Sequence, residues 1–295
     1  MADAPLNCEL IKKVGIITKR DIEDHKKLIE KLVKYLLKKK MEIVYDENSA
    51  KLYGKTGSKK ESVLSHSDMV VVLGGDGTLL KTARRLSRKR VPVLGVHLGH
   101  LGFLTETVPE KMFTVLDRVF SGQCAVDKRT LLRTTLYRKG KKLSTYLSLN
   151  DAVINQGSFA RLIQMRVEVN QRLIVRFKAD GLIVSTPTGS TAHSLSAGGP
   201  IVHPHVPSLI LSPICPSSLS MRPIALPDDR QITVFIETER RHDSEKLGLT
   251  LDGQDIIDLE YGDEIKFRKS MRSLYFIREG HKFYKMLRDK LSWGD

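Results

Sequence analysis

Apolar residues follow two different patterns along this chain, and the change between them divides it into two parts. Before about residue 125, short continuous apolar runs alternate with longer stretches in which apolar residues recur at helical spacing. The first pattern is typical of strands buried on both faces of a parallel sheet, the second of amphipathic helices. The predicted strands are 14–18, 43–45, 69–73 and 91–96, and the predicted helices are 21–40, 79–88 and 109–120. This alternation predicts a parallel α/β (Rossmann-like) domain over residues 1–125.

From residue 126 onward the apolar residues alternate with polar ones over short stretches, with little helix between them. The predicted strands are 131–137, 144–149, 152–155, 162–169, 173–177, 182–185, 231–237, 247–251 and 264–267. This pattern predicts an antiparallel β domain over residues 126–278. Residues 279–295 form a helical tail that can pack back on the first domain, with Phe283, Leu287 and Leu291 on one side of the predicted helix.

Two segments of the first part follow neither pattern and are predicted to be loops. Residues 48–62 carry two glycines and several lysines without apolar periodicity, which predicts a mobile surface loop. Residues 97–104 follow the predicted strand 91–96, at the edge of an open α/β sheet where ligands bind. His97 and His100 could be metal ligands, but no third ligand is evident nearby, so we interpret them as loop residues that line a crevice.

The predicted strand 69–73 ends at a turn with the sequence GGDGT, residues 74–78. Glycines allow a tight turn and let backbone N–H groups approach a ligand, and a helix that begins here adds a positive dipole end. We therefore predict that Gly74, Gly75, Gly77 and Thr78 hold phosphate. Asp76 places a carboxylate among these groups, where it is repelled by phosphate unless it binds a metal ion or accepts a proton.

Length and charge narrow the class of partner. At 295 residues and 33.3 kDa, the chain is long enough for two domains with separate cores. Its 49 Lys and Arg residues against 34 Asp and Glu residues give a formal net charge of +15, which favours an anionic partner. The basic residues form short clusters without interleaved aromatic residues, which favours a polyanionic small substrate over nucleic acid.

The same composition bears on the cellular compartment. The chain has no run of about 18 apolar residues and no apolar amino-terminal signal, so we expect a cytoplasmic protein that does not enter a membrane. Cys8, Cys124 and Cys215 lie far apart, which argues against a disulfide framework and against a thiolate zinc site.

Two polar stretches interrupt the alternating pattern of the second part. Asn150 and Asp151 set an amide beside a carboxylate at the start of a predicted strand. Residues 179–199 are dense in hydroxyl-bearing and small residues, so their backbone can approach a ligand closely and offer it many donors and acceptors. A Ser- and Thr-rich turn that caps a helix at 191–197 is the alternative, and the residues alone leave both interpretations open.

Four motifs resemble those of the NAD kinase family in order and in spacing. They are GGDGT at 74–78, LNDAVI at 149–154, DGLIVSTPTGSTAHSLSAGGPIVHP at 180–204 and PICPSSLSMRPIALP at 213–227. GGDGT alone is a weak signal, but the four together are specific, and the similarity covers nearly the whole chain. The resemblance implies an α/β domain followed by a β-sandwich domain, assembled as homodimers or homotetramers in which a neighbouring subunit contributes to the nucleotide site.

The resemblance also implies the reaction. NAD kinases transfer the terminal phosphoryl group of ATP, or in some members of polyphosphate, to the 2′-hydroxyl of the adenosine ribose of NAD, which gives NADP. Because an alcohol is a poor nucleophile, a carboxylate must accept its proton, and the resemblance gives this role to Asp76. A divalent ion, expected to be Mg²⁺, would bridge the donor's phosphate oxygens, and no side chain of the protein is assigned to it.

The residues that bind NAD follow from the same resemblance. Asn150 and Asp151 match the pair that hydrogen-bonds the adenosine part, and Asp180 matches the carboxylate that recognises the nicotinamide amide. Arg161, Lys178 and Gln254 stand where family members contact the dinucleotide, although a solvated residue on a strand is the alternative for each. The remaining predicted NAD contacts are Asp76, Gly77, Thr191, Ala192, His193, Ser194, Leu195 and Ser196.

His193 departs from the family pattern, which commonly has a tyrosine that lies against the nucleotide. An imidazole ring is smaller than the ring of tyrosine, and imidazole groups can become charged at about pH 6.5. The departure implies pH-dependent binding or a changed preference between NAD and NADH, and the hypothesis is that His193→Tyr tightens NAD binding.

Three other classes of protein are alternatives to an NAD kinase. A lipid kinase of the diacylglycerol type shares the GGDGT turn but should lack the segments around Asn150 and Thr191. A serine hydrolase would need a GxSxG elbow, which is absent although Ser190, His193 and Ser194 stand close in sequence. A dinucleotide-binding protein without catalysis would not need Asp76.

Overall fold

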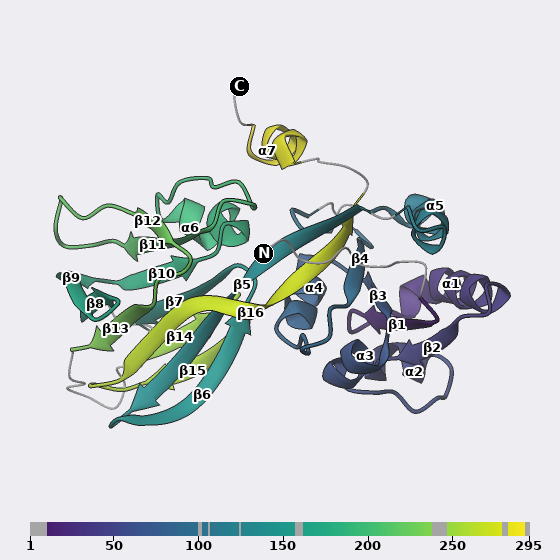
Figure 1. Ribbon diagram of the computed structural model, residues 1–295, viewed down its shortest axis with the longest axis horizontal. Helices are drawn as coiled ribbons and strands as arrows, with labels where there is room; N and C mark the ends of the chain where they lie inside the picture. Colours follow the sequence, from purple (N-terminus) through teal and green to yellow (C-terminus); the bar gives the residue numbers. More distant parts are fainter. Residues whose placement is uncertain are drawn as a thin grey trace. The chain divides into compact units, whose positions relative to one another are not determined.

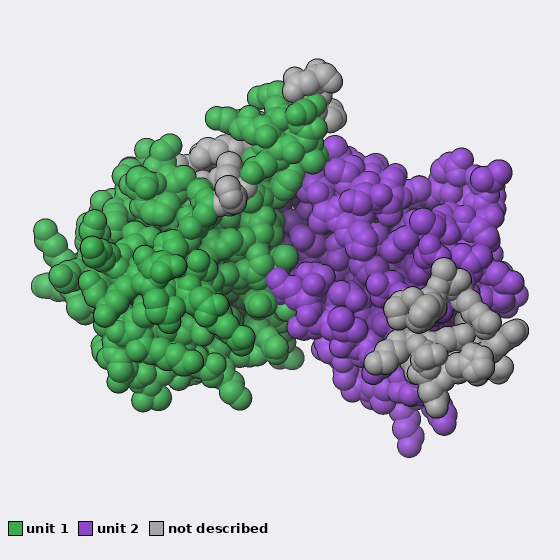
Figure 2. Space-filling view, turned by 180° about the vertical axis from the view of Figure 1, so that it is seen from behind, with its two compact units in different colours: residues 1–128, 272–295 green, residues 129–271 purple. Residues whose placement is uncertain are grey.

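The computed structural model describes residues 11–99, 102–105, 107–123, 125–156, 162–237, 247–278 and 283–292. The chain divides into two compact units, residues 1–128 with 272–295 and residues 129–271 (Figure 2). The chain passes from one unit to the other within two long strands, β5 (Ala125–Arg138) and β16 (Glu264–Arg278). The last part of the chain therefore belongs to the first unit.

The first unit contains a parallel sheet with the strand order β2-β1-β3-β4-β16. Its first four strands in sequence are β1 (Lys13–Thr18), β2 (Glu42–Tyr45), β3 (Met69–Leu73) and β4 (Pro92–Val96). Both β3 and β4 are buried along their whole length, as their continuous apolar sequences predict. The far end of β16 adds to this sheet, where Tyr275 and Phe276 pair with Pro92 and Val93 of β4.

Helices cover both faces of this sheet (Figure 1). Val14 and Ile16 pack in one core with α1 (Lys26–Lys38) and α5 (Pro109–Phe120). Gly15, between them, faces the other way and lies against Val63 of α3 (Lys60–His66). The other helices of the unit are η2 (Glu23–His25), α2 (Glu47–Lys51), α4 (Asp76–Ala83) and α7 (Phe283–Leu291).

The prediction of a mobile loop over 48–62 is wrong at both ends of the segment, because α2 covers residues 48–51 and α3 covers residues 60–62. Asp46 caps α2 by accepting a hydrogen bond from the Ser49 N–H at 2.8 Å, and it also pairs with Lys60 at 2.9 Å. Val63 and Leu64 of α3 are fully buried. Each helix is too short to show a repeated apolar pattern, so periodicity could not reveal it.

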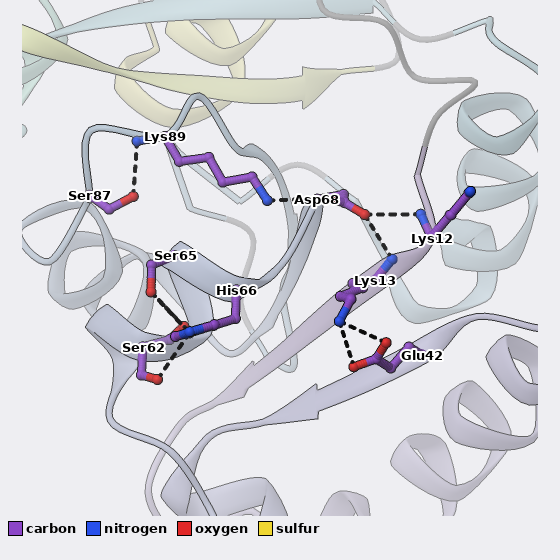
Figure 3. A network of polar contacts seen from close by, with 9 residues as sticks. All are labelled: Lys12, Lys13, Glu42, Ser62, Ser65, His66, Asp68, Ser87 and Lys89. Carbon is purple, nitrogen blue, oxygen red and sulfur yellow. Dashed lines mark hydrogen bonds and ion pairs between the residues drawn. The ribbon is translucent and has the colours of Figure 1, made fainter.

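Asp68, just before β3, ties three segments of the first unit together (Figure 3). Its carboxylate accepts hydrogen bonds from the backbone N–H groups of Lys12 and Lys13 at 3.1 and 3.0 Å and from Lys89 Nζ at 3.0 Å. Burial opposes the charge of Asp68, but these donors outweigh it, and the pKa of the carboxyl is lowered. The network fixes the start of the strand that leads into the GGDGT turn.

The second unit consists of two sheets of antiparallel strands packed face to face. One contains β5, β6 (Lys141–Ser148), β8 (Ile163–Val169), β9 (Arg172–Ala179), β13 (Ile232–Ile236) and the first part of β16. The other has the order β12 (Ile224–Pro227), β11 (Ser208–Ile214), β10 (Gly181–Ser185), β7 (Asp151–Gln156), β14 (Leu247–Leu251) and β15 (Asp255–Leu259). Apolar side chains from both sheets form a single core. The predicted order of an α/β domain and an antiparallel β-sandwich is thereby confirmed.

In the described part of the chain, no helix is long and apolar enough to cross a membrane.

Candidate active site

The GGDGT turn connects β3 to α4 in the first unit. The Gly74 N–H donates to the carbonyl of Val96 at 3.0 Å, and a Cβ at Gly74 would overlap the Thr78 side chain. Gly75 caps α4, and Gly75 and Gly77 are both exposed. The first turn of a helix combines outward N–H groups with a positive dipole end, so this exposed backbone is suited to hold phosphate.

The Asp76 carboxylate is held by the loop at residues 102–105. It accepts hydrogen bonds from the N–H groups of Phe103 at 2.8 Å, Leu104 at 3.2 Å and Thr105 at 3.0 Å, and from Thr105 Oγ1 at 3.0 Å. A Cβ at Gly102 would overlap this carboxylate, so only glycine allows so close an approach. The sequence predicts that this loop lines a ligand crevice, but it does not predict the contact with Asp76. The glycine-containing stretch GHLGFLT at 99–105 is the feature that could have indicated so close an approach.

Arg278, near the end of β16, brings a buried positive charge close to this carboxylate. Its side chain is 8% exposed and its Nε lies 2.9 Å from Asp127 Oδ2. Burial lowers the pKa of the guanidinium to about 10, against the electrostatic attraction of Asp76, which raises it. No sequence motif pointed to Arg278, because its relation to Asp76 depends on the pairing of β16 with β4.

In the second unit, Asn150 and Asp151 stand at the start of β7, and the carboxylate of Asp252 holds their backbone. Asp252 accepts hydrogen bonds from the N–H groups of Leu149 at 3.1 Å, Asn150 at 2.8 Å and Asp151 at 3.2 Å. Asp151 is only 4% exposed. Burial, followed by the negative charge of Asp252, raises the pKa of Asp151 to about 7. Asp151 can therefore exist as an acid or a carboxylate near neutral pH.

The hydroxyl-rich segment passes directly against Asn150. The Thr186 N–H donates to the Asn150 carbonyl at 2.9 Å, and a Cβ at Gly189 would overlap the Asn150 backbone. Arg129, which is 4% exposed, donates to Thr188 Oγ1 at 3.2 Å. The structure thus brings two of the predicted motifs together and adds Arg129, which the sequence did not indicate.

The continuation of this segment forms η3 (Thr188–Thr191) and the short helix α6 (His193–Ser196). His193 and Ser196 are exposed, whereas Ser194 is fully buried and its hydroxyl lies 2.9 Å from that of Ser212. The described contacts of Ser194 do not include a histidine, which gives a serine hydrolase no support. Thr191, Ala192 and Leu195 are half-buried.

The other predicted NAD contacts are scattered over the second unit. Asp180 is half-buried between β9 and β10, and its N–H donates to the Ile214 carbonyl at 3.0 Å. Lys178 is exposed on β9, and Gln254 is half-buried in the turn after β14. Arg161 lies outside the described residues. The structure does not bring Lys178 and Gln254 together through any described hydrogen bond.

Within the described residues, no group of three His, Cys, Asp or Glu side chains could hold a metal ion. His97 Nδ1 lies 2.9 Å from the Gly99 carbonyl, and His100 is outside the described part. Asp76 directs its oxygen atoms to N–H and O–H donors. The residues of the turn therefore fit a phosphate group, and a metal ion that arrives with that phosphate would be held by its oxygens and by water.

Gly189→Ala is expected to weaken NAD binding, because the added methyl group must push the turn away from the Asn150 backbone. We expect the turn to move by a few tenths of an ångström up to about 1 Å, and KM for NAD to rise about tenfold as a result. Gly248→Ala is the matched control, since a Cβ there meets its nearest neighbour at an ordinary 3.5 Å. Equal KM values for both variants and the wild type would contradict a role for this close approach.

Comparisons with known proteins show which family this chain resembles. Residues 14–124 match the family model of the ATP-NAD kinase N-terminal domain, and residues 149–279 match that of the ATP-NAD kinase C-terminal domain. The chain is 40% identical to an NAD kinase of Geotalea daltonii over 287 residues, 97% of this chain and 100% of the relative. It is 39% identical to one of Koribacter versatilis, covering 97% and 99% of the two chains.

Solved structures show the same fold. Yeast NADH kinase complexed with NADH superposes with a TM-score of 0.88 at 26% identity, covering 97% of this chain and 89% of the other. An NAD kinase from Archaeoglobus fulgidus in complex with ATP gives a TM-score of 0.75 at 24% identity, over 96% and 100% of the chains. With the glycine turn and its carboxylate, these matches define a phosphotransferase built from an α/β unit and a β-sandwich. The chain belongs to the NAD kinase family.

Proposed function

We propose that the protein transfers the terminal phosphoryl group of ATP to the 2′-hydroxyl of the adenosine ribose of NAD, giving NADP and ADP. The observation that carries this proposal is the fixed Asp76 carboxylate beside the exposed glycine backbone at the start of α4. Membership of the family over 97% of the chain identifies the nucleotide on which such a site acts.

In this proposal the GGDGT turn serves the phosphoryl donor. The backbone at Gly74, Gly75 and Gly77, with Thr78, holds phosphate oxygens, and a Mg²⁺ ion that enters with the donor would neutralise part of its charge. As the ribose oxygen forms its bond to the terminal phosphorus, the bond from that phosphorus to the leaving ADP oxygen breaks. Asp76 accepts the proton that the hydroxyl loses and returns it to solvent.

The second unit serves the dinucleotide. Asn150 and Asp151 hydrogen-bond the adenosine part. The Asp252 carboxylate keeps these two residues in place by accepting hydrogen bonds from their backbone N–H groups. Asp180 recognises the nicotinamide amide, and the segment from Thr191 to Ser196 lines the pockets, with the exposed ring of His193 against the nucleotide. Lys178, Gln254 and Arg161 complete the proposed contacts. Assembly as a homodimer or homotetramer also stays a prediction, which sedimentation of the purified protein would measure.

The deciding experiment is an assay of the purified protein with ATP, Mg²⁺ and NAD that follows the formation of NADP. We expect NADP to form, and none to form when Mg²⁺ is chelated. NADH is included as a second acceptor because one structural relative is an NADH kinase, and polyphosphate as a second donor. Binding of NAD without product from any donor or acceptor would contradict the proposal and favour a dinucleotide-binding protein, whereas phosphorylation of diacylglycerol would favour a lipid kinase.

A further inference from the structure

The two oxygen atoms of the Asp76 carboxylate have unequal surroundings. Oδ1 accepts from the Leu104 N–H at 3.2 Å, the Thr105 N–H at 3.0 Å and Thr105 Oγ1 at 3.0 Å. Oδ2 accepts from the Phe103 N–H at 2.8 Å and shares the Leu104 N–H at 3.3 Å. A carboxylate oxygen has about two lone pairs, so the three donors on Oδ1 fill its acceptor capacity, whereas Oδ2 has one donor of its own and shares the second, longer bond with Oδ1. A proton taken by Oδ2 displaces only its share of the Leu104 N–H, which Oδ1 keeps at 3.2 Å.

Thr105 is the one residue of the loop that binds this carboxylate through both its backbone and its side chain. It is fully buried, and its methyl group lies against Gly95 of β4, where a Cβ would approach it to 3.3 Å. Just beyond it, Thr107 forms a bridge with Val96, and its carbonyl accepts from the His97 N–H at 3.0 Å. Thr105 is therefore held against β4 by its own contact with Gly95 and by the nearby bridge between Thr107 and Val96.

We propose that Thr105 is a positioning residue for phosphoryl transfer: its hydroxyl fixes Asp76 Oδ1 so that Oδ2 alone faces the hydroxyl group of the acceptor. The inference rests on the proposed role of Asp76 as the proton acceptor. The Thr105 hydroxyl adds a bond from a fully buried side chain to the backbone donors of the carboxylate, and general-base catalysis depends on the orientation that these bonds set. Thr105 itself does not touch the substrate.

A positioning role predicts a particular kinetic pattern. Without the hydroxyl, Asp76 keeps its backbone donors but loses the bond that comes from a rigid side chain, so a smaller share of molecules has Oδ2 aligned. Binding of NAD does not depend on this alignment, whereas the chemical step does. The effect should therefore appear in kcat and leave KM for NAD nearly unchanged.

The test compares two pairs of variants that differ at position 105 only by the hydroxyl. Wild type and Thr105→Val have the same shape, and Thr105→Ser and Thr105→Ala form the smaller pair. We expect kcat for NADP formation to fall about 10- to 100-fold in Thr105→Val and Thr105→Ala, with KM for NAD within about twofold of wild type. Thr105→Ser should retain most of the turnover. If the valine variant does not fold, the Ser and Ala pair decides.

Thr82→Val is the matched control, because Thr82 is also fully buried in the first unit but its hydroxyl donates to the Thr78 carbonyl of its own helix. Its kcat should stay near that of the wild type. Wild-type kcat in Thr105→Val, an equal loss in Thr105→Ser and Thr105→Ala, or a change confined to KM would overturn the positioning role while the proposed function stands. A wild-type protein that makes no NADP would instead overturn both.

Discussion

Asp76→Asn is expected to lower kcat for NADP formation by about 10²- to 10⁴-fold, the usual contribution of a general base. The ribose hydroxyl must lose its proton as its oxygen attacks phosphorus, and an amide oxygen is far too weak a base to accept it. The substitution leaves the backbone of the turn, the proposed phosphate site, unchanged, so KM for ATP should change much less than kcat. Steady-state kinetics with ATP, Mg²⁺ and NAD measure both.

The same substitution has a structural consequence. The loop offers N–H or O–H donors to both oxygens of Asp76, so an amide nitrogen in place of either oxygen would face a donor. We expect a lower unfolding temperature together with a folded protein, since the other contacts of the loop remain. Asp117→Asn is a suitable control, because that side chain is 54% exposed on α5. A folded Asp76→Asn protein with near-normal kcat would show that Asp76 is not the proton acceptor.

Asp151→Asn is expected to stabilise the protein at pH 8 and to have little effect on stability near pH 4. In the unfolded chain the carboxyl group titrates at its ordinary pKa of 3.8, whereas burial and Asp252 raise the folded-state pKa to about 7. Between these values the folded state keeps a proton that the unfolded state has lost. The wild-type free energy of unfolding therefore falls as pH rises through this window and levels off above it.

The expected gain in the free energy of unfolding follows from the pKa difference of about three units between the folded and unfolded states. It amounts to about 4 kcal/mol at the upper end of the pH window. The Asn variant lacks this pH-dependent loss, so its advantage should grow from pH 4 to pH 7 and then stay constant. Unfolding by denaturant at several pH values measures it, with Asp229→Asn, a 69% exposed side chain, as the control. A variant that is destabilised by the same amount at every pH would contradict the raised pKa. KM for NAD is measured separately, because Asp151 is also a proposed adenosine contact.

Much of the fold could be predicted because it depends on local pattern. Continuous apolar runs identified β3 and β4, and alternating residues identified most strands of the sandwich. The strands β11, β12 and β15 were missed. β11 and β12 overlap the motif at 213–227, each contains a proline, and β12 and β15 are partly exposed edge strands without a clear alternation.

The long strand β16 shows a different limit of sequence reasoning. Its first residues were recognised as an antiparallel strand, but the strand continues to Arg278 and pairs in parallel with β4 in the other unit's sheet. A strand's partner depends on which edge is left open by the rest of the fold, and this information is not contained in the strand's own residues.

The sequence by itself determined the family and the two kinds of domain, and it predicts the site residues that lie in short motifs, because motif residues are neighbours along the chain. Tertiary structure alone decided which groups surround them. The donors to Asp76 come from 27 to 29 residues away, and the Asp252 carboxylate that holds Asn150 comes from 102 residues away. The basicity and orientation of a carboxylate depend on such neighbours, burial and charge, which only the folded chain brings together.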